Sequence, residues 1–133
     1  MEQIVIDTNL IISSIISPNG KPAMIMKLFF TAEIWTFYCP LILDEYKRVL
    51  SYDKFSFAEH TKSGILNAIE KLGIRIEPPK SDIPFTHEPD RIFYDTAKAS
   101  GSILITGNLK HYPTEPFIMT PSAFLNIVIG TMG

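Results

Sequence analysis

Four side chains that are far apart in this sequence are of types that could together hold a cation: the acids Asp7, Glu45 and Asp90 and the amide Asn108. Carboxylates that are brought together repel one another and resist shared ionisation, so a cluster of them is unfavourable unless a cation compensates. Ligation by oxygen atoms alone suits Mg²⁺ or Mn²⁺, which keep several water molecules and accept phosphates as further ligands. If the fold gathers these residues, the chemistry to expect is that of a bound divalent cation.

Asp7 and Asn108 each follow an apolar run that is typical of a buried parallel strand. The runs are Ile4–Ile6 and Ser102–Ile105, and polar residues succeed both of them. Ligands of open α/β sheets bind outside the carboxyl ends of the strands, so both side chains are expected at that rim. A second interpretation stays open for Asp7, because a carboxylate at this position could instead cap the helix that is expected to begin near Leu10.

Glu45 and Asp90 are expected near the beginnings of two helices at the same rim. In the helix over Leu41–Leu50, Glu45 falls on the border of the apolar stripe and points toward the sheet edge. Asp90 lies in the first turn of a later helix, on the side of Phe93 and Ala97. Both acids have an alternative interpretation: Glu45 as a solvated surface side chain, and Asp90 as a charge that stabilises the helix N-terminus by about 0.3–1 kcal/mol.

The other predicted elements alternate between helix and strand. A loop over 77–88 contains three prolines, and a short turn covers 109–112. Apolar periodicity and turn residues predict helices over 10–16, 22–32, 58–72 and 120–129, and strands over 35–38, 74–76 and 117–119. This order predicts one α/β domain over residues 1–133, a three-layer α/β/α arrangement with a central parallel sheet of four or five strands.

Composition limits the class of protein. A formal charge of −2 argues against nonspecific coating of nucleic acid, although a local basic patch stays open. The single cysteine, Cys39, cannot form an internal disulfide, and the chain begins in a strand without a basic and apolar leader. No apolar run approaches the length of a membrane span. We therefore expect a cytoplasmic protein that is not in the membrane.

The segments that carry the four polar residues are Val5–Asn9, Pro40–Glu45, Pro89–Phe93 and Leu104–Asn108. In this order and spacing they resemble the PIN-domain family, in its branch of toxin components of toxin–antitoxin pairs. The segment Met119–Leu125 resembles the closing segment of that branch, so the resemblance covers nearly the whole chain.

The resemblance implies a PIN-like fold and a ribonuclease that depends on Mg²⁺ or Mn²⁺. Asp7, Glu45 and Asp90 match the family's metal-binding acids. Hydrolysis of RNA would use a metal-activated water that attacks phosphorus in line. The implied partner is an antitoxin protein that inserts a basic or polar side chain into the acidic rim.

Three further positions carry over from the resemblance. Asn9 and Thr106 match polar neighbours that position metal-bound waters, and the fourth acid of many family members falls on Asn108. An amide can coordinate or orient a water but contributes no charge, so this departure leaves a non-enzymatic alternative open. That alternative is a PIN-fold module that binds RNA or a protein partner and cuts poorly or not at all.

Several other residues receive weaker assignments. His111 lies next to the expected rim and either contacts a phosphate or is a loop surface group. Asp95 resembles an acid found in part of the branch, but its helix face points away from the expected ligands. Phe29, Phe30 and Trp35 leave surface for a homodimer if the core does not consume all three. The basic side chains that could contact phosphate, without an assigned role, are Lys47, Arg48, Lys54, Lys62 and Lys110.

Overall fold

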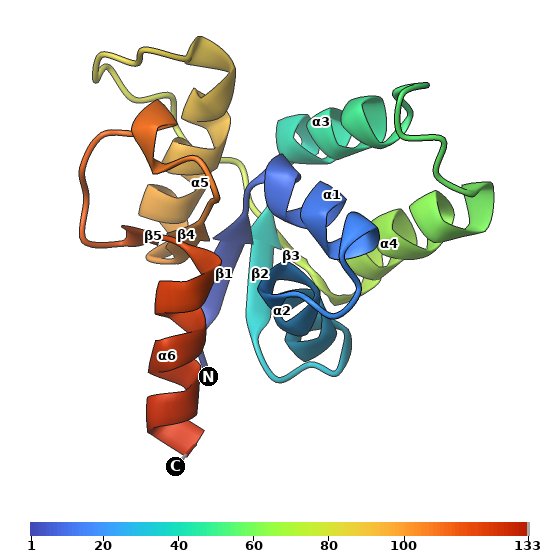
Figure 1. Ribbon diagram of the computed structural model, residues 1–133. Coiled ribbons are helices and arrows are strands. Elements are labelled where there is room, and N and C mark those ends of the chain that lie inside the picture. The colour runs from blue at the N-terminus through green and yellow to red at the C-terminus, as the bar shows by residue number, and fades with distance from the viewer. Residues whose placement is uncertain (133) are drawn as a thin grey trace.

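A parallel five-stranded sheet forms the centre of the computed structural model, which describes residues 1–132 (Figure 1). The strand order is β3-β2-β1-β4-β5, and each neighbouring pair is parallel. The strands are β1 (Gln3–Ile6), β2 (Trp35–Tyr38), β3 (Ile74–Arg75), β4 (Ile103–Ile105) and β5 (Ile118–Met119). The prediction of a central parallel sheet with four or five strands is confirmed.

Within residues 1–132, five α-helices and two short 3₁₀ turns connect these strands and a sixth helix follows β5, and the predicted three-layer arrangement is confirmed. Helix α5 packs across β1, β2 and β4, whereas α1, α2 and α6 pack beside one another on the other side of the sheet (Figure 1). The helices are α1 (Thr8–Ile16), α2 (Lys21–Phe30), α3 (Pro40–Leu50), α4 (Glu59–Leu72), α5 (Arg91–Ser100) and α6 (Pro121–Met132), and the 3₁₀ turns are η1 (Glu88–Asp90) and η2 (Leu109–His111).

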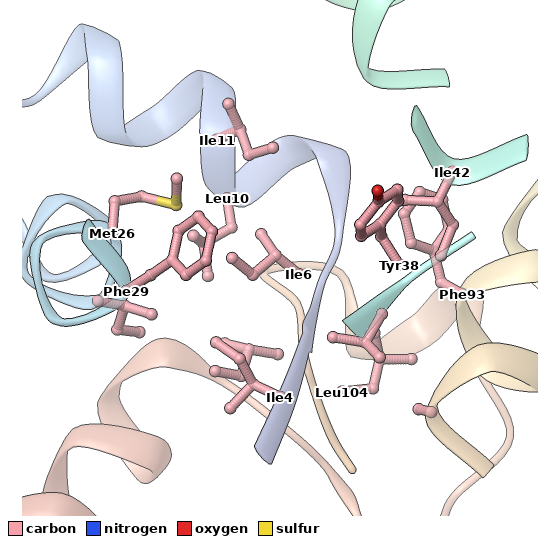
Figure 2. Packing of buried hydrophobic residues seen from close by; sticks show 14 of the residues in the cluster. Ile4, Ile6, Leu10, Ile11, Met26, Phe29, Tyr38, Ile42, Phe93 and Leu104 are labelled. Carbon is pink, nitrogen blue, oxygen red and sulfur yellow. The ribbon is translucent and has the colours of Figure 1, made fainter. Parts of the chain in front are cut away.

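The central strand β1 is apolar throughout its buried part because helices cover both of its faces. Ile4, Val5 and Ile6 are all fully buried. Alternate residues of a strand point to opposite faces, so a strand covered on both faces needs apolar residues at successive positions. Figure 2 shows Ile4 and Ile6 on the same side of β1 as Phe29 of α2. This double burial fixes β1 in the sheet, and with it the residue directly after the strand.

The pairing of β1 with β4 brings two polar residues to the same level of the sheet rim. Ile6 is paired with Ile105, and the backbone N–H of Asp7 donates to the carbonyl oxygen of Ile105 at 3.2 Å. The next residues along the two strands, Asp7 and Thr106, therefore lie side by side. Strand register thus positions the first pair of candidate site residues.

The predicted boundaries differ from the structure by at most three residues, and one glycine has a role other than the expected one. Gly73 follows α4 at the C-cap, as predicted. Its φ, however, is −73°, a value that any residue can adopt. A Cβ atom at Gly73 would lie 2.4 Å from the carbonyl oxygen of Ile69 and 2.9 Å from the ring of Tyr38. Close packing of α4 on β2 therefore requires this glycine.

Part of the aromatic surface predicted to be available for a homodimer is consumed by the core. Phe29 is buried, whereas Phe30 and Trp35 keep 42% and 46% of their surface exposed. None of the helices within residues 1–132 has the length and apolar character that crossing a bilayer would require.

Candidate functional site

Asp7 is the buried centre of the candidate site. Its Oδ2 atom accepts hydrogen bonds from the Thr106 hydroxyl at 2.7 Å, the Tyr112 hydroxyl at 3.1 Å and the Asn9 amide nitrogen at 3.2 Å. Although Asp7 occupies the N-cap position of α1, its side chain makes no capping hydrogen bond. The capping alternative therefore does not describe this carboxylate, which is held by residues from three separate parts of the chain.

Burial leaves the charge of Asp7 poorly compensated. Desolvation raises the pKa of Asp7, the nearby charge of Asp90 raises it further, and the hydrogen bonds from Thr106 and Tyr112 only partly oppose these effects. No lysine or arginine within residues 1–132 forms an ion pair with Asp7 or Asp90. A cation from solution would relieve this unfavourable arrangement.

Asp90 lies at the junction between η1 and α5, across the pocket from Asp7. Its side chain makes no capping hydrogen bond to α5, and its Oδ2 atom lies 3.1 Å from Nδ1 of His111. Burial raises the pKa of Asp90, while His111 and His87 lower it and Glu45 raises it again. Asp90 is thus a second partly buried acid that is electrostatically connected to both other acids.

Glu45 is placed at the edge of this group rather than within it. Its carboxylate forms a hydrogen-bonded ion pair with Arg48, one turn later on α3. Arg48 also donates to the hydroxyl of Tyr52. Glu45 is close enough to raise the pKa of Asp90, but its side chain faces Arg48 and does not line the pocket between Asp7 and Asp90.

A pocket of about 300 Å³ opens between these elements, and four of the six predicted site residues line it. Thr106 is fully buried behind Asp7 and Glu45 lies outside, so these two do not reach the pocket. The lining residues are Asp7, Thr8, Asn9, Ile12, Ser13, Val49, Phe55, His87, Asp90, Asn108 and His111. One aspartate from the end of β1 and one from the start of α5 therefore share a solvent-accessible cavity.

The polar neighbours of Asp7 form a connected frame. The Thr106 hydroxyl donates to Asp7 and accepts from the backbone N–H of Asn108 at 2.9 Å. The Asn9 side chain donates to Asp7 and accepts from the backbone N–H of Gly107 at 3.2 Å. Thr106 and Asn9 thus tie the first turn of α1 to the loop after β4, and both fix the carboxylate of Asp7.

Two residues of the site were not assigned from the sequence. Tyr112, buried behind Asp7, donates to its carboxylate, and His87 lines the pocket beside His111. The rings of His87 and His111 stack with centroids 4.6 Å apart. The only signal for His87 was its place three residues before Asp90, at the end of a loop without periodicity.

Asp95 lies away from the pocket, as predicted from its helix face. It is buried, and its Oδ2 atom accepts from the backbone N–H of Ser81 at 3.1 Å. Arg91 donates to the carbonyl oxygen of the same serine. Both side chains therefore hold the loop before η1 against α5.

Aromatic and basic side chains gather in the loop after α3, beside the pocket. The Tyr52 and Phe55 rings are nearly parallel with centroids 6.3 Å apart, and Phe57 stacks on Phe55 at 5.1 Å. Nζ of Lys54 lies 5.2 Å from the centroid of Phe55, and the Arg48 guanidinium lies 5.6 Å from that of Tyr52. Since Phe55 also lines the pocket, this aromatic cluster continues directly from the acids.

Comparison with known proteins identifies a family, and similar proteins include a relative from an archaeon and a chain of a solved complex. Residues 3–110 match the family model described as PIN domain. The chain is 35% identical over 109 residues to the uncharacterized protein MJ1680 of Methanocaldococcus jannaschii. The alignment covers 80% of this chain and 70% of that protein. This chain is also similar to a chain in the crystal structure of VapBC2 from Rickettsia felis bound to a DNA fragment from their promoter, with a TM-score of 0.56, 13% identity and coverage of 89% of this chain and 96% of the other. At that identity, the structural likeness concerns the fold alone.

Proposed function

This chain belongs to the PIN domain family, and from that premise we propose that it is a metal-dependent nuclease that hydrolyses phosphodiester bonds of RNA. PIN domains are generally nucleases. The observation that carries the proposal is the pair of aspartates, Asp7 and Asp90, which share one pocket without a lysine or arginine partner from residues 1–132. Two such acids with raised pKa values are suited to a divalent cation.

The residues present fit Mg²⁺ or Mn²⁺. Asp7 and Asp90 would supply carboxylate oxygens, Glu45 would join them after leaving Arg48, and Asn108 would bind or orient a water molecule. A bound divalent cation activates water for in-line attack on phosphorus and stabilises the leaving oxygen. The hydrogen bonds from Thr106 and Tyr112 keep the Asp7 carboxylate in one orientation, which limits the reorganisation needed on binding.

The aromatic cluster supports a single-stranded RNA substrate. Unpaired bases stack on aromatic side chains, and basic side chains hold the phosphates that connect them. Tyr52 and Phe55 with Lys54 and Arg48 provide both kinds of group at the edge of the pocket. RNA that enters across this cluster would bring a phosphate toward Asp7.

We further propose that the protein is the toxin of a toxin–antitoxin pair, acts in the cytoplasm, and is inhibited by an antitoxin whose basic or polar side chain enters the acidic pocket. The resemblance of the opening, middle and closing segments to that branch supports this role, and the fold it shares with the VapBC2 chain is in keeping with it. The homodimer suggested by exposed Phe30 and Trp35 belongs to the same proposal.

A binding module without cleavage is the second candidate function, and two observations favour it. Asn108 adds no charge where many family members carry a fourth acid, and Glu45 is already neutralised by Arg48. Such a module would bind the cation and RNA but leave the RNA intact.

The test is cleavage of single-stranded RNA by purified protein with Mg²⁺ or Mn²⁺, in the presence and absence of excess EDTA. We expect cleavage that EDTA abolishes and that Asp7→Asn and Asp90→Asn remove. Asp44→Asn is the matched control, because Asp44 is an exposed acid next to Glu45 on α3. Cleavage that persists in EDTA contradicts the metal mechanism, and metal binding without cleavage of any tested RNA supports the binding module. For the toxin role, growth arrest on expression should disappear in Asp90→Ala.

A further inference from the structure

We propose that His87, Asp90 and His111 form a metal site of their own, selective for cations that prefer imidazole nitrogen, such as Zn²⁺. The acids expected from the sequence supply oxygen alone, whereas this set supplies two nitrogens and one oxygen. One potential ligand atom from each residue lies within 4.8 Å of the other two. The inference rests on the proposed function only through Asp90, which belongs to both sets.

The fold brings these three residues together from two separate turns. His87 immediately precedes η1, Asp90 ends η1, and His111 ends η2, which comes after β4. The Asp90 Oδ2 atom lies 3.1 Å from Nδ1 of His111, and the two imidazole rings are inclined by only 25°. Since all three side chains line the same pocket, a cation could reach them from solvent.

An ion pair between Asp90 and His111 explains only part of this arrangement. It does not require a second imidazole, yet the ring of His87 stacks on that of His111 and makes no side-chain hydrogen bond within residues 1–132. Two neighbouring imidazoles would repel one another if both were protonated, whereas two neutral imidazoles can bind a cation together. A metal site accounts for all three residues.

The donor set determines which cation this site prefers. Zn²⁺ binds histidine nitrogen at about 2.0–2.1 Å, and sites with two histidines and one carboxylate leave a further position for water. Mg²⁺ favours carboxylate oxygen and water, and gains little from imidazole. The two histidines would therefore bind the cation as neutral ligands, and Asp90 would be the charged ligand of this set.

The site is tested by metal binding to untagged, metal-free protein, without RNA. Zn²⁺ affinity is measured by competition with a chromophoric chelator, and Co²⁺ serves as a spectroscopic probe because its visible bands report nitrogen ligands. We expect His87→Ala and His111→Ala each to weaken Zn²⁺ binding by about tenfold or more and to weaken the Co²⁺ bands, with Mg²⁺ binding unchanged. His60→Ala is the control, because His60 is an exposed histidine on α4 that lies outside the pocket.

Circular dichroism confirms that the variants fold, and His87→Gln and His111→Gln replace any alanine variant that does not. Zn²⁺ binding that both histidine variants retain at the wild-type affinity overturns the proposed site. The outcome is separable from that of the RNA assay. Loss of Zn²⁺ binding in the histidine variants supports the site even if no RNA is cut. If instead Zn²⁺ binding does not depend on the histidines and the protein cuts RNA with Mg²⁺, the site is refuted and the nuclease proposal stands.

Discussion

Replacing Thr106 with valine removes one hydroxyl from the frame that holds Asp7 and keeps the shape of the side chain. The hydroxyl donates to the buried carboxylate at 2.7 Å and accepts from the backbone N–H of Asn108 at 2.9 Å. Thr106→Val therefore removes both hydrogen bonds, and of the two the bond to Asp7 is the one made to a charged group.

The expected loss is large enough to measure by thermal unfolding. A hydrogen bond to a charged group contributes about 1.5–3 kcal/mol. For a chain of 133 residues the entropy of unfolding at Tm is about 0.28 kcal/mol/K, so Tm should fall by about 5–10 °C. The measurement is made in EDTA, so that metal binding does not contribute.

The loss should also depend on pH. The pKa of Asp7 is raised in the folded state by burial, and the Thr106 hydrogen bond lowers it, so Thr106→Val raises it further. The folded state then holds more protons than the unfolded state between the unfolded pKa of about 3.9 and the raised folded pKa, and stability falls as pH rises through that window. The difference between wild type and Thr106→Val should therefore be small at acidic pH and reach its full size once Asp7 is ionised in both proteins.

Thr106→Ser provides the matched control, because it keeps the hydroxyl and loses only a methyl group. Its loss of stability should not change with pH. Urea unfolding at several pH values measures both variants, and carbon NMR of the Asp7 carboxyl reports the pKa directly. Equal, pH-independent losses in Thr106→Val and Thr106→Ser would refute the assignment of Thr106 as the residue that orients Asp7.

Three more outcomes are expected, two at Asp7 and one at the packing of α4 on β2. Mn²⁺ or Mg²⁺ at about 100 times its Kd should raise the Tm of the wild type by about 10 °C, and Asp7→Asn should abolish the increase. Differential scanning fluorimetry with and without EDTA measures both proteins. An equal increase in both would place the metal elsewhere. Tyr112→Phe should lower the free energy of unfolding by about 1–2 kcal/mol and raise the pKa of Asp7, because the phenol donates to that carboxylate at 3.1 Å; an unchanged pKa in the NMR titration would contradict this. Gly73→Ala should lower the free energy of unfolding by about 1–3 kcal/mol, because its Cβ would overlap Ile69 and Tyr38; denaturant unfolding at wild-type stability would show that α4 moves freely.

The parts of the site that depend on topology were predictable from the sequence. The apolar runs before Asp7 and before Thr106 predict two parallel strands, and a parallel sheet places the residues after both strands at one rim. That these two strands are neighbours is seen only in the structure. The same rule predicts the position of Asp90, because this residue lies at the beginning of the helix that leads from that rim back to β4. These predictions need only the period of the apolar residues and the direction of the strands.

The parts that depend on side-chain rotamers or on irregular loops were not predictable. Helical spacing places Glu45 on the border of its apolar stripe, but the choice between facing the pocket and pairing with Arg48 is a rotamer choice that spacing does not encode. His87 belongs to a loop with no apolar period, so its stacking on His111 arises only from tertiary packing. Tyr112 was hidden for the same reason, since a tyrosine after a short turn carries no signal of what its hydroxyl contacts.

The pairing of Ile6 with Ile105 makes the pocket sensitive to changes in chain length within the two strands. Deleting or inserting a single residue within β1 or β4 would shift one strand by about 3.3 Å and turn its last side chain to the opposite face. Asp7 and Thr106 would then separate even if every hydrophobic contact could be rebuilt. Substitutions in these two strands can be absorbed by repacking, but indels cannot, so the position of the acid is set by the length of the central strands rather than by the loops.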